Sequence, residues 1–343
     1  MSQPLGVGVL GLGSIGTSHA RAFHQLSDKA HMVAYSGGNP ERAAEAGWPN
    51  AVQVAADDLP HRSDVDVVAI CSPSDAHGPQ AIAALEAGKH VVVEKPLALT
   101  VAEAERIVAL AEERGRVLSV ISQRRLEPEY AAVKSMLEAG DLGQVRLATT
   151  HVHWWRDDEY YAAAPWRSQM GAGGGSVMNQ GVHNIDLLNW LCGPVARVTA
   201  QYATLGHEID AEDTTVATVQ FAGGALGLIS TSTATPPGSP ATVTVHTDRG
   251  TIELGQGEVL RWDIDAPNPA DTSEEAGPAS GAADPAAIGI AGHVAQWDDI
   301  VAAISEDRQP QISGRDGAET VRLMCAIYEA AQTGRAVQPE ELA

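Results

Sequence analysis

The chain has 343 residues, enough for two domains, and its 22 Lys and Arg against 44 Asp and Glu give a formal net charge of −22. An acidic surface repels phosphate backbones and anionic lipid, so neither nucleic acid nor a membrane is expected as a partner. Three widely spaced cysteines predict no disulfide framework or zinc site, and without a basic leader or a run of about 18 apolar residues the chain is expected to be cytoplasmic.

The first third of the chain alternates short apolar runs with Ala-rich segments of helical period. Because parallel strands need crossover connections, this alternation predicts an α/β domain with a doubly wound parallel sheet, which we assign to residues 1–122. The expected strands are Gly6–Leu10, His31–Tyr35, Val65–Cys71, His90–Glu94 and Val117–Ile121, and the expected helices are Ser18–Leu26, Pro79–Ala87 and Val101–Arg114.

A glycine-rich loop follows the first expected strand and opens the first helix. Its glycines permit a tight turn, close approach of a pyrophosphate and close packing of helix on strand, and the helix N-terminus attracts the phosphates. The loop therefore predicts a dinucleotide site rather than a plain strand-to-helix turn. The residues expected to contact the cofactor are Gly11, Gly13, Ser14, Ile15 and Gly16.

The second expected strand ends in Tyr35-Ser36, and the next acidic residue is Glu41. A carboxylate about 20 residues beyond the glycine loop usually binds the ribose 2′-hydroxyl of NAD, and none stands at this strand end. Ser36 could hydrogen-bond a 2′-phosphate and Arg42 could supply positive charge, which favours NADP within a general prediction of NAD(P). Alternatively, Glu41 and Arg42 form an ion pair on a surface helix.

The fourth expected strand ends in Glu94-Lys95-Pro96. A lysine at the carboxyl end of a parallel strand points into the crevice where open α/β sheets bind ligands. Desolvation would lower the pKa of Lys95, and the charge of Glu94 would oppose that change. The alternative is a surface lysine that covers apolar neighbours with its stem.

The pattern of apolar and polar residues changes after an expected helix at Pro128–Ala139. Runs of period two separated by short turns predict a second, α+β domain over residues 123–343, with an antiparallel sheet that exposes one face. Residues 265–289 are acidic and rich in Pro, Ala and Gly, which predicts a surface loop. The expected strands are Val145–His153, Val198–Thr204, Thr214–Phe221, Ala225–Thr231, Ala241–Thr247 and Thr251–Leu254, and the closing helices, His293–Ser305 and Asp316–Thr333, could pack back on the first domain.

Motifs in both domains resemble the Gfo/Idh/MocA oxidoreductase family. Its hallmark is a Glu-Lys-Pro tripeptide after the fourth strand, here Glu94-Lys95-Pro96. The stretch Gly173 to Asp186 (GGGSVMNQGVHNID) resembles the family's GGG…GxHxxD segment, and Trp166-Arg167 precedes it at the usual distance. The resemblance extends to the turn at Gly140-Asp141-Leu142-Gly143 and covers nearly the whole chain.

The resemblance implies a two-domain dehydrogenase whose Rossmann domain carries the nicotinamide and whose open, mostly antiparallel sheet contributes to a homo-oligomer, either a dimer or a tetramer. Substrates in the family are mostly cyclitols, sugars and nucleotide sugars. Lys95 and His183 match the family's catalytic lysine and histidine. By resemblance, further cofactor contacts are expected from Ser72, Pro73, His77, Glu94, Lys95, Gln123, Trp166 and Arg167.

His183 can accept or return a proton near neutral pH, although its spacing alone fits a helix-face histidine equally well. Many family members carry aspartate where this chain has Asn179. On a helix, positions i and i+4 share a face, so Asn179 and His183 should both face the substrate. Because asparagine carries no charge, either His183 works unaided or Lys95 carries more of the proton transfer.

Five of the 15 aromatic residues lie between Trp154 and Trp166, directly before the glycine-rich stretch. Aromatic faces suit sugar or cyclitol rings, and arginines suit a carboxylate or a phosphate. The alternative is a local aromatic core with two surface arginines. The candidate substrate contacts are Lys95, Gln123, Arg124, Trp155, Arg156, Tyr161, Asn179 and His183, with His293 as a weaker candidate.

No metal site is expected, because His151 and His153 alternate on a strand without a third ligand at a diagnostic spacing. The main hypothesis is an NAD(P)-dependent oxidoreductase that acts on a hydroxyl or keto carbon of a sugar, a sugar derivative or a cyclitol. The rival hypotheses are an NAD-dependent glycosidase that works by transient oxidation and elimination, and a non-catalytic regulator that senses nucleotide. The fold alone does not decide between them.

Overall fold

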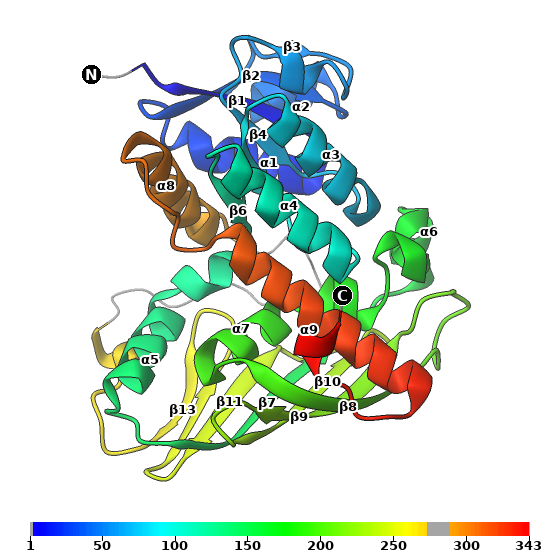
Figure 1. Cartoon of the computed structure of the whole chain (residues 1–343), viewed down its shortest axis with the longest axis vertical. Coiled ribbons are helices and arrows are strands. Elements are labelled where there is room, and N and C mark those ends of the chain that lie inside the picture. The colour runs from blue at the N-terminus through cyan, green and yellow to red at the C-terminus, as the bar shows by residue number, and fades with distance from the viewer. Residues whose placement is uncertain (1–2, 273–288, 343) are drawn as a thin grey trace. The chain divides into compact units, whose positions relative to one another are not determined.

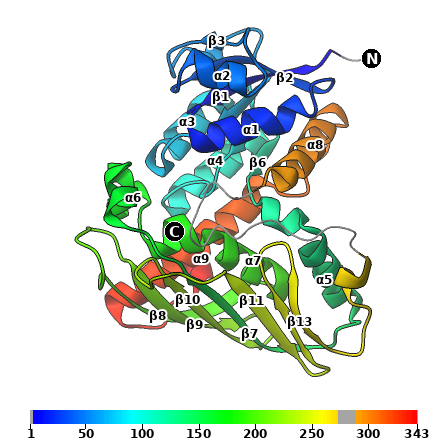
Figure 2. The ribbon, with the colours of Figure 1, turned by 180° about the vertical axis from the view of Figure 1, so that it is seen from behind.

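The computed structural model describes residues 3–272 and 289–342, and Figures 1 and 2 show the chain from opposite sides. The chain divides into two compact units. Unit 1 comprises residues 1–123 and 290–321, and unit 2 comprises residues 124–289 and 322–343. Among the helices in the described ranges, none has the length and apolar content needed to cross a bilayer.

Unit 1 is built on a six-stranded parallel sheet in the order β3-β2-β1-β4-β5-β6, which confirms the doubly wound α/β fold. Helices α3 and α4 cover one face and α1 and α8 cover the other (Figures 1 and 2). The strands are β1 (Leu5–Leu10), β2 (Ala30–Ser36), β3 (Val52–Gln53), β4 (Val67–Ile70), β5 (His90–Val93) and β6 (Leu118–Val120). The helices are α1 (Ser14–His24), α2 (Pro40–Glu45), α3 (Ser74–Glu86), α4 (Val101–Glu113) and α8 (Ala291–Ser305).

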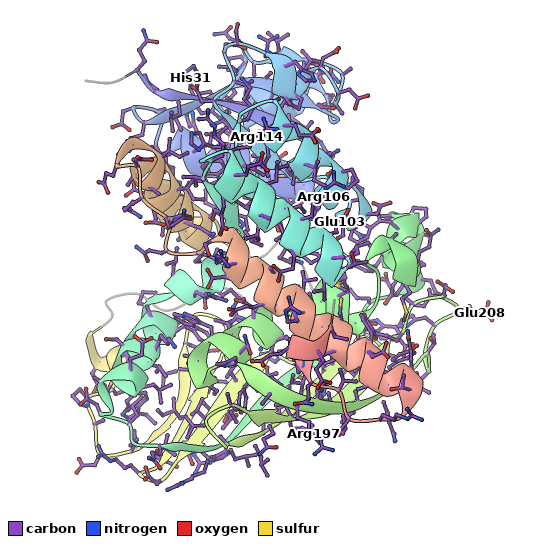
Figure 3. All side chains as sticks on the ribbon, viewed as in Figure 1. His31, Glu103, Arg106, Arg114, Arg197 and Glu208 are labelled. Atoms are coloured by element: carbon purple, nitrogen blue, oxygen red, sulfur yellow. The ribbon has the colours of Figure 1, made fainter. Side chains whose placement is uncertain are left out.

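The core of unit 1 explains why these segments form these elements. All four residues of β4 are buried, as expected for a strand with helices on both faces. Helix α4 buries Ala104, Ile107 and Val108, whereas Arg106 and Arg114 are exposed (Figure 3). This spacing of three to four residues is the amphipathic period that predicts the helix.

Two elements of unit 1 were not predicted, and two helices begin earlier than expected. Strand β3 has only two residues, both exposed, so no alternation marks it. Helix α2 could have been found, because Asn39 caps it by accepting from the backbone N–H of Arg42 and Pro40 occupies its first turn. Helix α1 begins at Ser14, within the glycine-rich segment, and α3 begins at Ser74 and continues through Pro79.

Unit 2 contains a seven-stranded sheet in the order β13-β12-β11-β7-β10-β9-β8, mostly antiparallel as expected. Strands β7 and β10 are parallel, with Leu147 opposite Leu226. Alternation reports which side chains are buried and not which strand lies alongside, so it could not reveal this pair. The strands are β7 (Val145–His153), β8 (Val195–Ala203), β9 (Thr214–Phe221), β10 (Leu226–Ser232), β11 (Thr242–Thr247), β12 (Thr251–Leu254) and β13 (Val259–Asp263), of which β13 was not predicted.

Helices cover one face of this sheet. Helix α7 (Val182–Cys192) packs on β7 and β11, and α5 (Pro128–Ala139) packs on α7. The remaining helices are α6 (Asp158–Ala162) and α9 (Gly314–Thr333), which begins in unit 1 and ends in unit 2. Of the expected surface loop at 265–289, residues 273–288 lie outside the described residues, and Pro269–Thr272 forms a short 3-10 turn.

Candidate functional site

The glycine loop of unit 1 leaves room at the N-terminus of α1. Gly11 has φ 89°, and a Cβ there would lie 2.7 Å from the backbone of Cys71. A Cβ on Gly16 would lie 2.2 Å from the carbonyl oxygen of Gly11, whereas a Cβ on Gly13 would meet nothing within 4 Å. No side chain caps α1, so its first N–H groups can donate to a ligand. The loop therefore fits the pyrophosphate of a dinucleotide.

The loop is fixed to the end of β2, where an adenosine ribose would bind. The N–H groups of Gly11 and Leu12 donate to the carbonyl oxygen of Ser36 at 2.9 and 3.0 Å. Gly37 and Gly38 then turn the chain with positive φ, and Arg42 lies exposed in the first turn of α2. The strand end therefore carries the Ser36 hydroxyl, and Arg42 follows it in the first turn of α2.

The loop after β4 is tied to the turn after β5 by His77. Its ring is buried, and its nitrogens lie 2.7 Å from the carbonyl oxygen of Pro96 and 2.9 Å from that of Ser72. The Ser72 hydroxyl donates to Gln80 at 2.6 Å, and Pro73 precedes α3. Through these two backbone carbonyls, His77 fixes the loop after β4 to the turn after β5, and its contact with the cofactor stays a prediction.

Glu94 and Lys95 follow β5. Glu94 is buried, and its oxygens accept from His19 Nε2 at 2.9 Å and from the Lys95 backbone N–H at 3.1 Å. Burial alone would raise the pKa of Glu94, but its hydrogen bonds and the nearby His293 hold the pKa well below its usual value. Burial lowers the pKa of Lys95, and the charge of Glu94 opposes this. Gln123 is also buried, and its Oε1 has no hydrogen-bond partner among the described residues.

In unit 2, Asn179 and His183 belong to differently wound turns. Ser176–Gly181 forms a π-helical turn that leads into α7, where His183 is half-buried. The π turn is wider than the α-helical turn assumed for the i, i+4 relation, and a common face for the two side chains toward the substrate stays a prediction. The Asn179 amide donates to Tyr160 Oη at 3.2 Å, which directs it toward the aromatic segment.

Glu212 holds this π turn. Its carboxylate is buried and accepts from the Val177 N–H at 2.9 Å, the Ser176 hydroxyl at 2.5 Å and the Tyr328 hydroxyl at 2.8 Å. Burial raises the pKa of Glu212, and the hydrogen bonds oppose that shift. No sequence motif marked Glu212, because its partners are 35, 36 and 116 residues away.

Two guanidinium groups flank one tyrosine in the aromatic segment. The guanidinium carbons of Arg156 and Arg167 lie 5.3 and 4.1 Å from the centre of the Tyr160 ring. Arg156 is buried and donates to Gln180 Oε1 at 3.2 Å, and burial lowers its pKa. The half-buried Trp166 lies 5.9 Å from the Arg167 guanidinium. This concentration of positive charge suits an anionic group.

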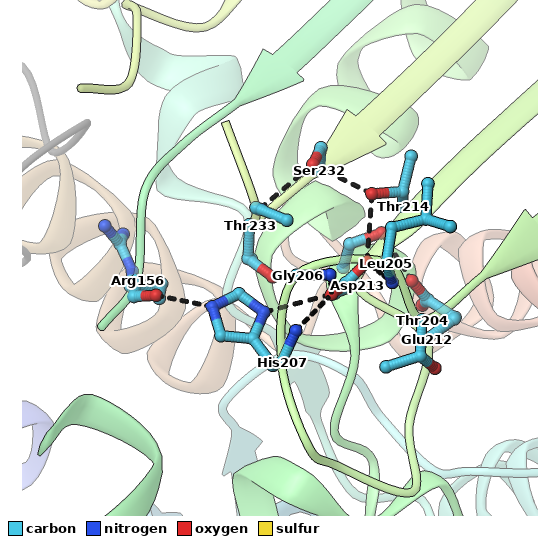
Figure 4. Close-up of polar contacts among 12 residues, drawn as sticks. Arg156, Thr204, Leu205, Gly206, His207, Glu212, Asp213, Thr214, Ser232 and Thr233 are labelled. Carbon is cyan, nitrogen blue, oxygen red and sulfur yellow. Dashed lines mark hydrogen bonds and ion pairs between the residues drawn. The ribbon is translucent and has the colours of Figure 1, made fainter. Parts of the chain in front are cut away.

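Loop residues 204–213, which were not predicted as part of the site, pack against the aromatic segment and hydrogen-bond to it. Asp213 accepts from the N–H groups of Leu205, Gly206 and His207 at 2.9, 2.7 and 3.1 Å. The ring of His207 lies between Asp213, at 3.0 Å, and the carbonyl oxygen of Arg156, at 2.7 Å (Figure 4).

The same ring packs on two candidate substrate contacts. Trp155 stacks on His207 with the ring centres 5.6 Å apart, and Tyr161 lies 4.9 Å away. Tyr161 also bonds to Thr233 through its hydroxyl at 2.8 Å, and burial raises the pKa of this tyrosine to about 12. The hydroxyl therefore stays protonated near neutral pH.

Arg124, a predicted substrate contact, makes several hydrogen bonds within unit 2. Its guanidinium is buried and donates to Asn184 and the Gly255 carbonyl at 2.9 Å, and to Tyr130 and Glu127 at 3.3 Å. Four contacts leave little donor capacity for a ligand. These contacts join α5, α7 and the turn after β12, and a substrate contact for Arg124 stays a prediction.

Asp186, the last residue of the GxHxxD segment, also has a structural contact. Its two oxygens accept from Arg125 Nε at 2.8 Å and Nη2 at 2.5 Å, and both side chains are about 5% exposed. This bidentate ion pair fixes the segment before α5 to α7. Asp186 lies about one helical turn after His183. The ring centres of His151 and His153 lie 5.4 Å apart on β7. Within residues 3–272 and 289–342, the potential ligand atoms of His19, Glu94 and His293 come within 4.8 Å of one another.

Comparisons with known proteins agree with this geometry. Residues 5–122 match a family model described as oxidoreductase family, NAD-binding Rossmann fold, and residues 130–253 match the GFO/IDH/MocA C-terminal domain. The structure of WlbA dehydrogenase from Bordetella pertussis in complex with NADH and UDP-GlcNAcA is 33% identical, with a TM-score of 0.86 and 98% of both chains covered.

Two curated relatives match in part. Oxidoreductase YdgJ from Escherichia coli is 33% identical over 209 residues, which are 60% of this chain and 58% of that protein. The match therefore spans less than two thirds of YdgJ. Myo-inositol 2-dehydrogenase from Thermotoga maritima is 29% identical over 255 residues, 72% of this chain and 74% of the relative.

The buried ion pair generates a stability prediction. Asp186→Asn leaves the Arg125 charge buried without its counter-charge, which should destabilise the protein by about 3 kcal/mol or more. The urea denaturation midpoint should fall accordingly. The double variant Arg125→Met/Asp186→Leu removes both charges and should recover much of the loss. An unchanged midpoint for Asp186→Asn would show that the pair is not needed.

Proposed function

Because the chain belongs to the Gfo/Idh/MocA family of NAD-binding oxidoreductases, we propose that it transfers hydride between a nicotinamide and a hydroxyl or keto carbon of a sugar, sugar derivative or cyclitol. The observation that carries the proposal is the position of Lys95, directly after β5 and beside the buried carboxylate of Glu94. Strand β5 lies in the same parallel sheet as β1, which the open glycine loop follows. Relatives named for NADH, a nucleotide sugar and myo-inositol support the same chemistry.

In this proposal, the nicotinamide supplies the site that accepts or returns the hydride. Lys95 takes the hydroxyl proton of the substrate as the carbinol C–H bond breaks and the carbonyl forms. A lysine with a lowered pKa has a larger fraction of neutral amine near pH 7, which this step requires. Glu94 limits the fall in that pKa, so the lysine can also return a proton in the reductive direction.

His183 is the second proposed acid and base. Asn179 provides no negative charge to stabilise an imidazolium, and its amide already donates to Tyr160. We therefore assign the main proton transfer to Lys95. In this assignment, His183 hydrogen-bonds to the substrate hydroxyl, and Asn179 is a neighbouring hydrogen-bonding group.

Arg156, Trp155 and Tyr161 are the proposed substrate contacts. The two guanidiniums around Tyr160 favour a substrate that carries a carboxylate or a phosphate over a neutral sugar. Gln123 and the glycine loop are the corresponding contacts on the cofactor.

Activity tests the two acid-base residues directly. Purified protein is screened against inositols, sugars, sugar acids and glycosides with NAD and NADP, and reduced nicotinamide is followed by absorbance. Lys95→Ala and His183→Ala should each lower kcat by a factor of about 10² or more. Lys29→Ala, at an exposed lysine, is the control and should retain full activity.

Near-normal turnover in both variants would refute the proposed acid-base roles. Cleavage of a chromogenic glycoside without net NADH formation would instead identify a redox-assisted glycosidase.

The proposed preference for NADP is tested by fluorescence titration. Ser36 and Arg42 should make NADPH bind more tightly than NADH. Arg42→Ala should weaken the binding of NADPH about tenfold and leave the binding of NADH nearly unchanged, because only the 2′-phosphate of NADPH loses an ion pair. Arg21→Ala, exposed on α1, is the control. Clearly tighter binding of NADH by the unmodified protein would contradict the preference.

We also propose that the open face of the unit 2 sheet packs against a second copy of the chain. Leu147, Val216 and Leu226 on β7, β9 and β10 are 41, 46 and 57% exposed, on the face opposite α7. Exposed apolar side chains on neighbouring strands are typical of an interface. By resemblance, the assembly would be a dimer or a tetramer.

Light scattering after size-exclusion chromatography measures the assembly. Leu226→Lys places a charge in the proposed interface and should lower the molar mass toward 35.8 kDa. Leu205→Lys, at a leucine 73% exposed in a loop, should not. If the unmodified protein is already a monomer, the proposed interface is wrong.

A further inference from the structure

A chain of buried hydrogen bonds crosses unit 1 from α8 to the turn after β5. Trp297 is fully buried, and its indole Nε1–H donates to His19 Nδ1 at 2.8 Å. His19 Nε2 lies 2.9 Å from Glu94 Oε1, and Glu94 Oε2 accepts the Lys95 N–H at 3.1 Å. Trp297 and His19 are 278 residues apart, so nothing in the local sequence marks this contact.

The indole determines the protonation state of His19. An indole nitrogen is a donor only, so His19 Nδ1 must present its lone pair. The ring proton then lies on Nε2, where it donates to the Glu94 carboxylate. A second proton on Nδ1 would face the indole N–H, so both hydrogen bonds form only with a neutral ring. Burial acts in the same direction and lowers the pKa of His19.

Several other groups face Glu94. His293 Nε2 from α8 lies 3.8 Å from Glu94 Oε1, and both ring nitrogens of His293 are buried without a hydrogen-bond partner among the described residues. Its ring meets that of His19 edge-on, with centres 5.0 Å apart. The buried Cys71 after β4 has a raised pKa through burial and the charge of Glu94. His77 from α3 also feels that charge.

His19, Glu94 and His293 bring three possible ligand atoms within 4.8 Å of one another, as a metal site would require. However, His19 could bind a metal through Nε2 only if its proton moved to Nδ1, opposite the indole donor. Metal binding would therefore cost the Trp297 hydrogen bond. The geometry favours the proton on Nε2 and the hydrogen bond to Glu94 over a metal ion.

We propose that Trp297 and His19 are positioning residues for Lys95: the indole holds His19 as a neutral Nε2–H donor, and His19 holds Glu94 as an anion against the backbone and charge of the lysine. This inference rests on the proposed role of Lys95 in proton transfer. Without the His19 donor, Glu94 would be a buried carboxylate with one hydrogen bond fewer, and it would take up a proton. The charge that opposes the fall in the pKa of Lys95 would then disappear.

The protonation state of His19 is measured by nitrogen NMR on the full chain with ¹⁵N-labelled histidine. His19 should show an unprotonated Nδ1 and a protonated Nε2 that do not change between pH 5 and 8. In Trp297→Phe, which keeps an aromatic ring but loses the donor, His19 should titrate within that range. Trp48→Phe is the matched control, because it removes an indole hydrogen bond to the backbone of α1, the helix that carries His19, and leaves the bond to His19 in place.

The effect on Lys95 is measured without substrate. The chain has only four lysines, Lys29, Lys89, Lys95 and Lys134, so ¹³C-methylated lysines can be titrated individually by NMR. His19→Leu should lower the pKa of Lys95 by about one unit or more. His19→Gln retains an oxygen for the indole and an N–H for Glu94, and should leave that titration unchanged.

A protonated Nδ1 on His19 in the unmodified protein, or an equal Lys95 titration in the leucine and glutamine variants, would overturn the inference. If the ¹⁵N NMR signals of both His19 and His293 shift upon addition of stoichiometric Zn²⁺, these residues form a metal site and the inference is wrong. Neither measurement depends on turnover, so a failure of the His19 and Lys95 titrations is distinguishable from a failure of the proposed function.

Discussion

Burial of a carboxylate is the constraint on which the rest of this structure depends. Removing a carboxylate from water costs several kcal/mol unless protein donors replace the lost hydration. The chain carries 44 acidic residues. Of those that the structure describes, Glu94, Asp186, Glu212 and Asp213 are buried next to segments of the candidate site. Each has donors in place, from His19, Arg125, Ser176 and the loop backbone respectively. These acids hold the backbone and side chains of the candidate site in place.

Much of the fold could be predicted because its signals are local. Each apolar run, in β1, β4 or β5, is a continuous stretch of a few residues, and the glycine loop directly follows β1. The alternating residues of β7, and likewise those of β9, also lie within one short segment. The motif around Lys95 also depends on neighbours in sequence. Local patterns could not show that β7 and β10 are parallel, because a strand's alternation is the same beside either partner.

The supports of the candidate site could not be predicted for a related reason. Arg124 could equally have faced a ligand, and only the folded chain brings Asn184 and the Gly255 carbonyl to its guanidinium. Glu212 and His207 carry no motif, since each has a hydrogen-bond partner in a distant segment, Tyr328 and Arg156 respectively. Chemistry at a strand end can thus be inferred from residue types, whereas the hydrogen bonds that hold it require the tertiary structure.

The interrupted course of unit 1 bears on how the protein is made. Its core includes Trp297 and Ile300, which follow the whole described sheet of unit 2 in the chain and pack with Phe23 and other residues of the first segment. A ribosome that adds about 5–20 residues per second needs roughly 10–35 s to travel from residue 123 to α8. During that interval the nascent first segment lacks the indole that pairs with His19 and part of its own interior. Unit 2 can therefore complete most of its sheet on the ribosome before the nucleotide-binding unit is finished.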